Sequence, residues 1–152
     1  MTPAEFMSEI VLPTALEFRR HLHSRRHAYL TCIAVFHVKD HLSKAGVQGI
    51  EAAVRSRTDN MLDVVRGVCN GTKHVQTDAR HRVAFPAGDD TDQPDLGFGA
   101  GGFGVGRYGG IGGREIEVDG RQVDLYDACA AVLRAYVALY PQHFIGCDLS
   151  GL

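Results

Sequence analysis

The chain lacks the features on which several large classes of protein depend. Among its 152 residues there is no tryptophan, and the formal net charge is only −2. A charge so close to neutral gives no global field that would draw the protein onto nucleic acid or onto an anionic membrane. Any binding of RNA must therefore come from a local cluster of basic side chains.

Long apolar runs and paired cysteines are absent as well. The longest apolar stretch, AYLTCIAVF, is far too short to cross a bilayer, so we expect no association with a membrane. The opening MTPAEFMSEIVLP has no positively charged region of the kind that begins a signal peptide. The four cysteines form no C-x-x-C pair, which indicates reduced, structural thiols and predicts a cytoplasmic protein.

What the first half does contain is helical periodicity. The stretch Thr2-Pro3-x-Glu5 predicts a helix that begins with a capping box, and Pro13 predicts an interruption soon afterwards. From about residue 14 to residue 45 the pattern predicts one long helix. Its segment 28–38 is apolar almost all the way round, so we expect that segment to be buried. Two shorter helices are predicted at about 48–57 and at about 58–74.

The second half changes character. The stretch RHRVAFP (80–86) suggests a short strand, and AGDDTDQPD is an acidic, turn-rich loop followed by a glycine-rich segment. Alternating polar and apolar residues around Asp119-Gly120 predict a β-hairpin. Asp124 then caps a last helix that Pro141 ends.

The sequence therefore predicts a mainly α fold. We expect a helical bundle of four to five helices, with a small β-hairpin and a glycine-rich loop inserted before the last helix. The whole chain, 1–152, is interpreted as a single domain by its length. Its parts are a helical region at 1–75, the glycine-rich loop and hairpin at 80–124, and the C-terminal helix at 125–140.

The helix that ends at residue 74 carries a polar stripe. Asp63, Arg66, Asn70 and His74 recur at steps of three and four residues, so they lie on one face. One interpretation is an ordinary solvated face of an amphipathic helix. The other is a site, because arginine can hold a phosphodiester while histidine moves protons at neutral pH.

The arrangement of Arg66 and His74 on one helix resembles the active helix of the HEPN superfamily of small helical-bundle ribonucleases and toxins. The resemblance implies a metal-independent ribonuclease in which Arg66, Asn70 and His74 are catalytic and Lys73 contributes a charge that binds phosphate. The order of elements, with a helix that ends Asn-x-x-Lys-His, is also similar to that of a group of small bacterial proteins. This second resemblance implies the architecture and carries no activity.

A dense basic patch occupies FRRHLHSRRH, at residues 18–27. It offers a second place to bind phosphate, and its alternative is a solvated helix face. The acidic loop, with Asp89, Asp90, Asp92 and Asp95, is a candidate to neutralise this patch, within the molecule or across a dimer. The four arginines of the basic patch are Arg19, Arg20, Arg25 and Arg26.

Two further patterns are candidate cofactor sites. His37 and His41 are four residues apart, which is a spacing that lets two imidazoles share a metal ion, although buried neutral histidines show the same spacing. The glycine-rich segment matches G-x-G-x-x-G, but without the strand and helix that a nucleotide site needs. We therefore expect neither a metal nor another cofactor.

Two classes of function follow. The composition favours a bundle without catalysis that acts through a protein partner or through self-association as a homo-oligomer. The alternative is a HEPN-like protein that binds RNA or cleaves it.

Overall fold

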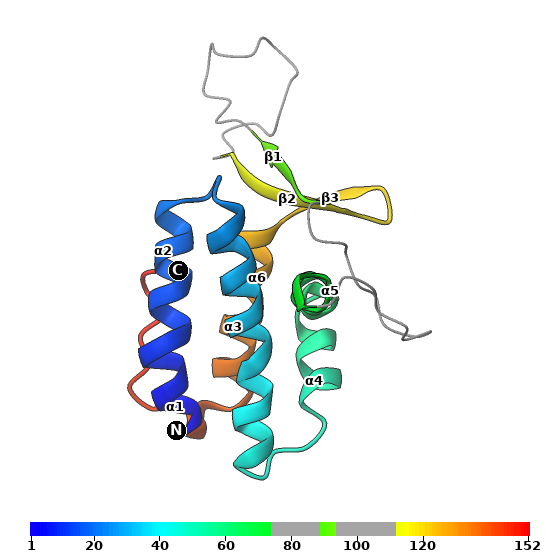
Figure 1. Ribbon diagram of the computed structural model, residues 1–152. Helices are drawn as coiled ribbons and strands as arrows, with labels where there is room; N and C mark the ends of the chain where they lie inside the picture. Colours follow the sequence, from blue (N-terminus) through cyan, green and yellow to red (C-terminus); the bar gives the residue numbers. More distant parts are fainter. Residues whose placement is uncertain (74–88, 94–111) are drawn as a thin grey trace.

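The computed structural model describes residues 1–73, 89–93 and 112–152, and these form a helical bundle with a small sheet at one end (Figure 1). The mainly α fold with a hairpin before the last helix is therefore confirmed. The elements run in this order: α1 Pro3–Phe6, a π-helical turn Met7–Val11, α2 Leu12–Arg20, α3 Arg25–Lys44, α4 Ile50–Arg57, α5 Met61–Lys73, β1 Thr91–Gln93, β2 Gly113–Val118, β3 Arg121–Asp124, α6 Leu125–Leu139 and a 3₁₀ turn Pro141–His143.

The predicted start of the first helix is confirmed, but the predicted interruption at Pro13 is wrong. Thr2 and Glu5 form the capping box, each side chain bonding the other's backbone N–H. The helical backbone then continues from α1 into α2 through the π-helical turn. In that turn the N–H of Leu12 reaches back to the carbonyl of Met7, five residues earlier. The wider turn lets the helical chain pass Pro13, which has no N–H to donate.

The prediction of one long helix over 14–45 is also wrong, because the chain breaks between α2 and α3. Ser24 caps α3 by accepting the backbone N–H of His27. The carbonyls of Leu22 and His23 turn outward and accept the backbone N–H and the Nε–H of Arg114. Strand β2 therefore docks on the turn that separates the two helices.

The core lies where α3 meets α5 and α6. Most of segment 28–38 is buried as predicted, although Leu30 is 43% exposed. In Figure 1, α2 and α3 lie side by side, whereas α5 is seen end-on and crosses α3. The largest fully buried side chains are those of Tyr136, Phe18, Met7, Leu42, Leu62, Leu125 and Leu133.

The hairpin turns where the sequence predicted. Val118 pairs with Arg121, and the two residues between them, Asp119 and Gly120, have φ of 51° and 76°. Such a turn requires positive φ at both positions, which Asp and Gly tolerate. Part of the acidic segment, expected to be a loop, instead forms β1 and pairs antiparallel with β2. The predicted strand at 80–86 and the glycine-rich residues up to 111 lie outside the described residues.

Candidate functional site

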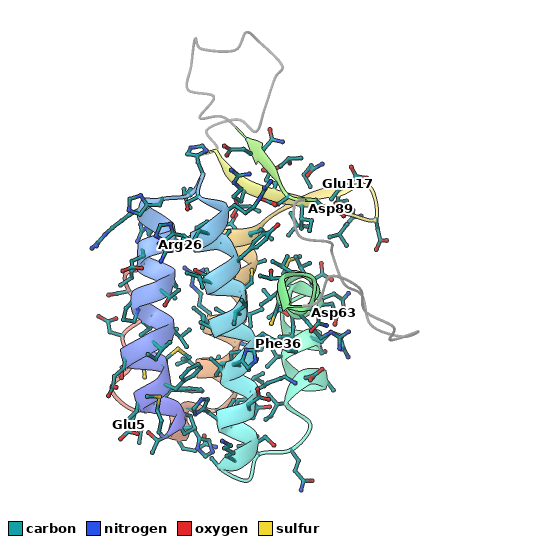
Figure 2. The ribbon with its side chains drawn as sticks, viewed as in Figure 1. Glu5, Arg26, Phe36, Asp63, Asp89 and Glu117 are labelled. Carbon is teal, nitrogen blue, oxygen red and sulfur yellow. The ribbon has the colours of Figure 1, made fainter. Side chains whose placement is uncertain are left out.

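The predicted stripe of α5 is turned toward the neighbouring helices. The side chain of Arg66 is 18% exposed and that of Asp63 is 27% exposed. The guanidinium of Arg66 donates to Glu51 of α4 at 3.3 Å and lies 3.1 Å from the carboxylate of Asp63. Figure 2 places Asp63 on the side of α5 that faces α4. These residues therefore do not form the open solvated face that one interpretation of the sequence expected.

The two carboxylates that contact Arg66 each form a further ion pair. Glu51 accepts from Lys39 of α3 at 2.6 Å, and Asp63 accepts two hydrogen bonds from Arg55 of α4, at 2.7 and 3.1 Å. Each carboxylate is thus shared by two cations, and three helices are tied together. We call this group the α3–α4–α5 cluster; its members are Lys39, Glu51, Arg55, Asp63, Arg66 and Asn70.

The charges within the cluster shift the pKa values of two of its members, Glu51 and Arg55. Burial raises the pKa of Glu51, but the hydrogen bond from Lys39 and the nearby positive charges outweigh this effect, so the net shift is downward. The hydrogen bond and charge of Asp63 raise the pKa of Arg55. Both shifts favour the charged forms, as expected for a network in which each charge has a partner.

Two donors of the cluster nevertheless have no acceptor. Within the described residues, the buried Nε of Arg66 and Nδ2 of Asn70 make no hydrogen bond. They stand four residues apart on α5, one turn from each other. Because buried donors normally have a partner, these two are candidates to bind a further group. His74 and the side chain of Lys73, which the sequence groups with them, lie outside the described part.

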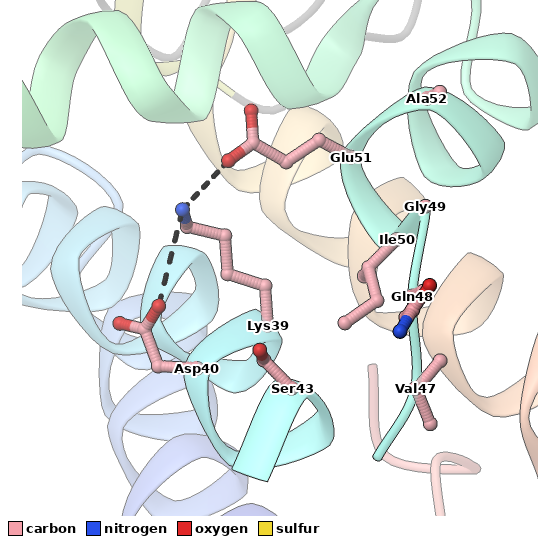
Figure 3. Close-up of a pocket in the computed structure, with 9 residues that line it drawn as sticks. All are labelled: Lys39, Asp40, Ser43, Val47, Gln48, Gly49, Ile50, Glu51 and Ala52. Atoms are coloured by element: carbon pink, nitrogen blue, oxygen red, sulfur yellow. Dashed lines mark hydrogen bonds and ion pairs between the residues drawn. The ribbon is translucent and has the colours of Figure 1, made fainter.

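An open depression borders the cluster between the end of α3 and the start of α4 (Figure 3). Its volume is about 410 Å³. Lys39 lies along one side and reaches between Asp40, at 3.9 Å, and Glu51. The depression thus combines charged groups with apolar surface. Its lining residues are Lys39, Asp40, Ser43, Val47, Gln48, Gly49, Ile50, Glu51 and Ala52.

The two histidines of the predicted metal pair make separate contacts in the described structure. The ring of His37 bonds the carbonyl of Ile33 through Nδ1 at 2.6 Å, whereas His41 stacks on Phe6 with ring centroids 4.1 Å apart. Among residues 1–73, 89–93 and 112–152, histidine, cysteine and carboxylate side chains form no group of three or more that would hold a metal ion.

The basic patch is divided between internal contacts and solvent. Arg19 donates to the carbonyl of Gly151, while Arg20 and Arg26 are exposed. Arg25 donates to Asp90 at 2.8 Å, which confirms that the acidic segment neutralises part of the patch within one molecule.

Asp90 is the centre of a second polar network. Its side chain is fully buried and accepts the Tyr29 hydroxyl at 2.5 Å, Arg25 at 2.8 Å and Arg114 at 3.2 Å. Arg114 also lies 3.5 Å from Asp92, which in turn contacts His23. The sequence had identified the acidic side of this network but not Tyr29 or Arg114, because neither carries a local signal that predicts its partner.

Comparisons with known proteins supply no further assignment. No family model matches the chain, and no match was found among curated proteins or solved structures. Every helix in the described part of the chain is too short or too polar to cross a membrane.

Proposed function

We propose that this protein is a non-catalytic binding module that engages a protein partner, or a second copy of itself, through the depression between α3 and α4. The observation that carries the proposal is the shape of the depression. Sites for small molecules enclose most of the ligand. An open hollow of about 410 Å³, with apolar surface beside charged groups, instead suits side chains presented by another polypeptide.

The state of Arg66 supports the same proposal. An arginine that holds a phosphodiester needs its guanidinium available, whereas that of Arg66 is shared between Glu51 and Asp63. Two carboxylates at this distance oppose the approach of a phosphate group. The arrangement favours a structural role for the cluster, which keeps the walls of the depression in place. We propose a cytoplasmic location, because the thiols of Cys32, Cys129 and Cys147 are reduced in the structure.

Filling the depression tests this proposal. Ser43 is exposed in the depression, and Ser56 is exposed on α4 away from it, so Ser43→Trp and Ser56→Trp form a matched pair. We expect Ser43→Trp alone to weaken self-association, measured by sedimentation velocity over a range of concentrations. If the protein is monomeric, the same variant should lose a partner that quantitative cross-linking detects with wild type. Equal behaviour of the two variants would contradict the proposal.

A second function is favoured by one specific observation. The unpaired donors of Arg66 and Asn70 lie on successive turns of α5, and His74 follows Asn70 by four residues in the sequence. An RNA-directed, HEPN-like ribonuclease would use the arginine to hold the scissile phosphate and the histidine to move protons. In this alternative Lys73 and the exposed Arg20 and Arg26 would contact the phosphate backbone.

A cleavage assay on unstructured RNA distinguishes the two proposed functions. The ribonuclease function requires cleavage by wild type that Arg66→Ala and His74→Ala each abolish while circular dichroism shows an unchanged fold. Absence of cleavage by wild type, together with the Ser43→Trp effect, would leave the binding module as the function.

A further inference from the structure

Two cysteines that are far apart in the sequence meet in the core. Cys32 lies on α3 and Cys129 lies in the first half of α6, and their sulfur atoms are 3.6 Å apart. The two residues are 0% and 1% exposed, and both thiols are free. A disulfide bond is about 2.0 Å long, so the sulfurs would need to approach by roughly 1.6 Å.

The other two cysteines have contacts of their own. Cys69 is buried on α5, and the thiol of Cys147, beyond α6, donates to the carbonyl of Ala4 at 3.8 Å. The sulfur–sulfur contact of Cys32 and Cys129 is made between two helices that pack on each other.

We propose that Cys32 and Cys129 are a site of intramolecular disulfide formation, and that the folded protein selects this pair over every other pairing of its cysteines. Folding holds the two sulfur atoms in contact, whereas the unfolded chain must close a loop between residues 97 positions apart in the sequence. The folded state therefore gives this pair a far higher effective concentration than the unfolded chain does.

The oxidant that the reaction requires is a small disulfide such as oxidised glutathione. One protein thiol loses its proton and attacks the small disulfide, which forms a mixed disulfide and releases one small thiolate. The second protein thiol then loses its proton and attacks the protein sulfur of the mixed disulfide, which expels the second thiolate. The protein loses two electrons and two protons, and the small disulfide becomes two thiols.

The burial of the pair makes the reaction slow without making it unfavourable. The hydrogen bond between Cys129 and Cys32, together with burial, raises the pKa of Cys129 well above its ordinary value. The thiolate, which is the nucleophile, is therefore scarce, and the oxidant has no path to it until α3 and α6 separate. Oxidation then depends on transient opening of the core, and the closed bundle retains the bond once it has formed.

An equilibrium measurement tests the selection directly. The full chain is brought to equilibrium in mixtures of reduced and oxidised glutathione, both natively and in concentrated urea, starting from reduced and from oxidised protein. Acid quenching, alkylation and peptide mass spectrometry then quantify each pairing. We expect the equilibrium constant for Cys32–Cys129 to be at least about tenfold larger in the folded protein than in urea, which corresponds to a shift of about 30 mV.

Two variants make the result specific. Cys69→Ala/Cys147→Ala should keep the same constant, and Cys32→Ala should lose the cross-linked peptide while circular dichroism shows the fold unchanged. An equal or smaller constant in the folded protein would overturn the proposal. Predominant pairing of Cys69 or Cys147 in the folded wild type would overturn it as well.

Discussion

Helix α3 takes part in two polar networks that differ in how completely their groups are satisfied. Near its start, the buried carboxylate of Asp90 accepts from Arg25, Tyr29 and Arg114 at 2.5 to 3.2 Å. Further along, Lys39 connects α3 to the α3–α4–α5 cluster, whose charged members are partly exposed. One network surrounds a single buried acceptor with donors, whereas the other distributes its charges over three helices.

The difference separates structural polar groups from candidate functional ones. A fully buried carboxylate is tolerated only when hydrogen bonds and opposite charges replace its hydration, and Asp90 has both. In the α3–α4–α5 cluster each carboxylate has two cations, yet the Nε of Arg66 and the Nδ2 of Asn70 have no acceptor in the described residues. Unpaired donors, rather than charge alone, therefore make Arg66 and Asn70 the candidates of this cluster for binding a further group.

Removal of the Asp90 carboxylate should have the largest effect. Asp90→Ala leaves the exposed Arg25, the partly buried Arg114 and the Tyr29 hydroxyl without their shared acceptor. We expect a loss of about 3 kcal/mol in the free energy of unfolding. Urea denaturation followed by circular dichroism measures this loss. Asp89→Ala, a change at the exposed neighbouring residue, is the control and should cost no more than about 0.5 kcal/mol. Equal stability of the two variants would show that Asp90 is not a structural anchor.

Arg66→Met should cost less, although Arg66 contacts two carboxylates. The methionine keeps much of the apolar stem, Glu51 keeps Lys39, and Asp63 keeps Arg55, so no carboxylate is left alone. We expect a loss of about 1 to 2 kcal/mol in the same urea experiment. Arg57→Met, on the exposed side of α4, is the matched control. A loss as large as that of Asp90→Ala would remove the distinction between the two networks.

Asn70→Leu examines an unfilled donor. If the amide of Asn70 has no partner in the folded protein, an apolar side chain of similar size should leave stability unchanged within about 0.5 kcal/mol or raise it by up to about 1 kcal/mol. The urea unfolding measurement, compared with wild type, shows whether stability is unchanged or raised. A loss above about 1 kcal/mol would mean that the amide is hydrogen-bonded in solution, and the leftover donors would no longer mark a site.

Other parts of the molecule show where sequence reasoning succeeds. The capping box at Thr2, the turn at Asp119-Gly120 and the cap at Asp124 depend on residues within a few positions of one another, and all three were predicted correctly. The burial of segment 28–38 follows from its composition alone. Local rules and apolar patterning were enough for these features.

Features that depend on distant partners were not predictable. The break between α2 and α3 involves Arg114, which is 91 residues from His23, and β1 exists as a strand only because it pairs with β2. The stripe on α5 was identified by its spacing. Its partners Glu51 and Arg55 belong to α4, and no local pattern indicates that packing would bring them to Arg66 and Asp63.

The smallest expected effect concerns the pH dependence of the α3–α4–α5 cluster. Because the pKa of Glu51 is lowered in the folded protein below its ordinary value of 4.5, its ionised form stabilises the fold. That contribution is fully present above pH 4.5 and is lost as the pH falls through the lower, folded-state pKa. Glu51→Gln should therefore lower the melting temperature slightly at neutral pH, and the difference from wild type should shrink on acidification to about pH 3. Thermal unfolding at a series of pH values measures both, with the exposed Glu117→Gln on β2 as control. A difference that stays constant with pH would mean that Glu51 stabilises the protein by packing, and that the ion pairs with Lys39 and Arg66 contribute nothing measurable.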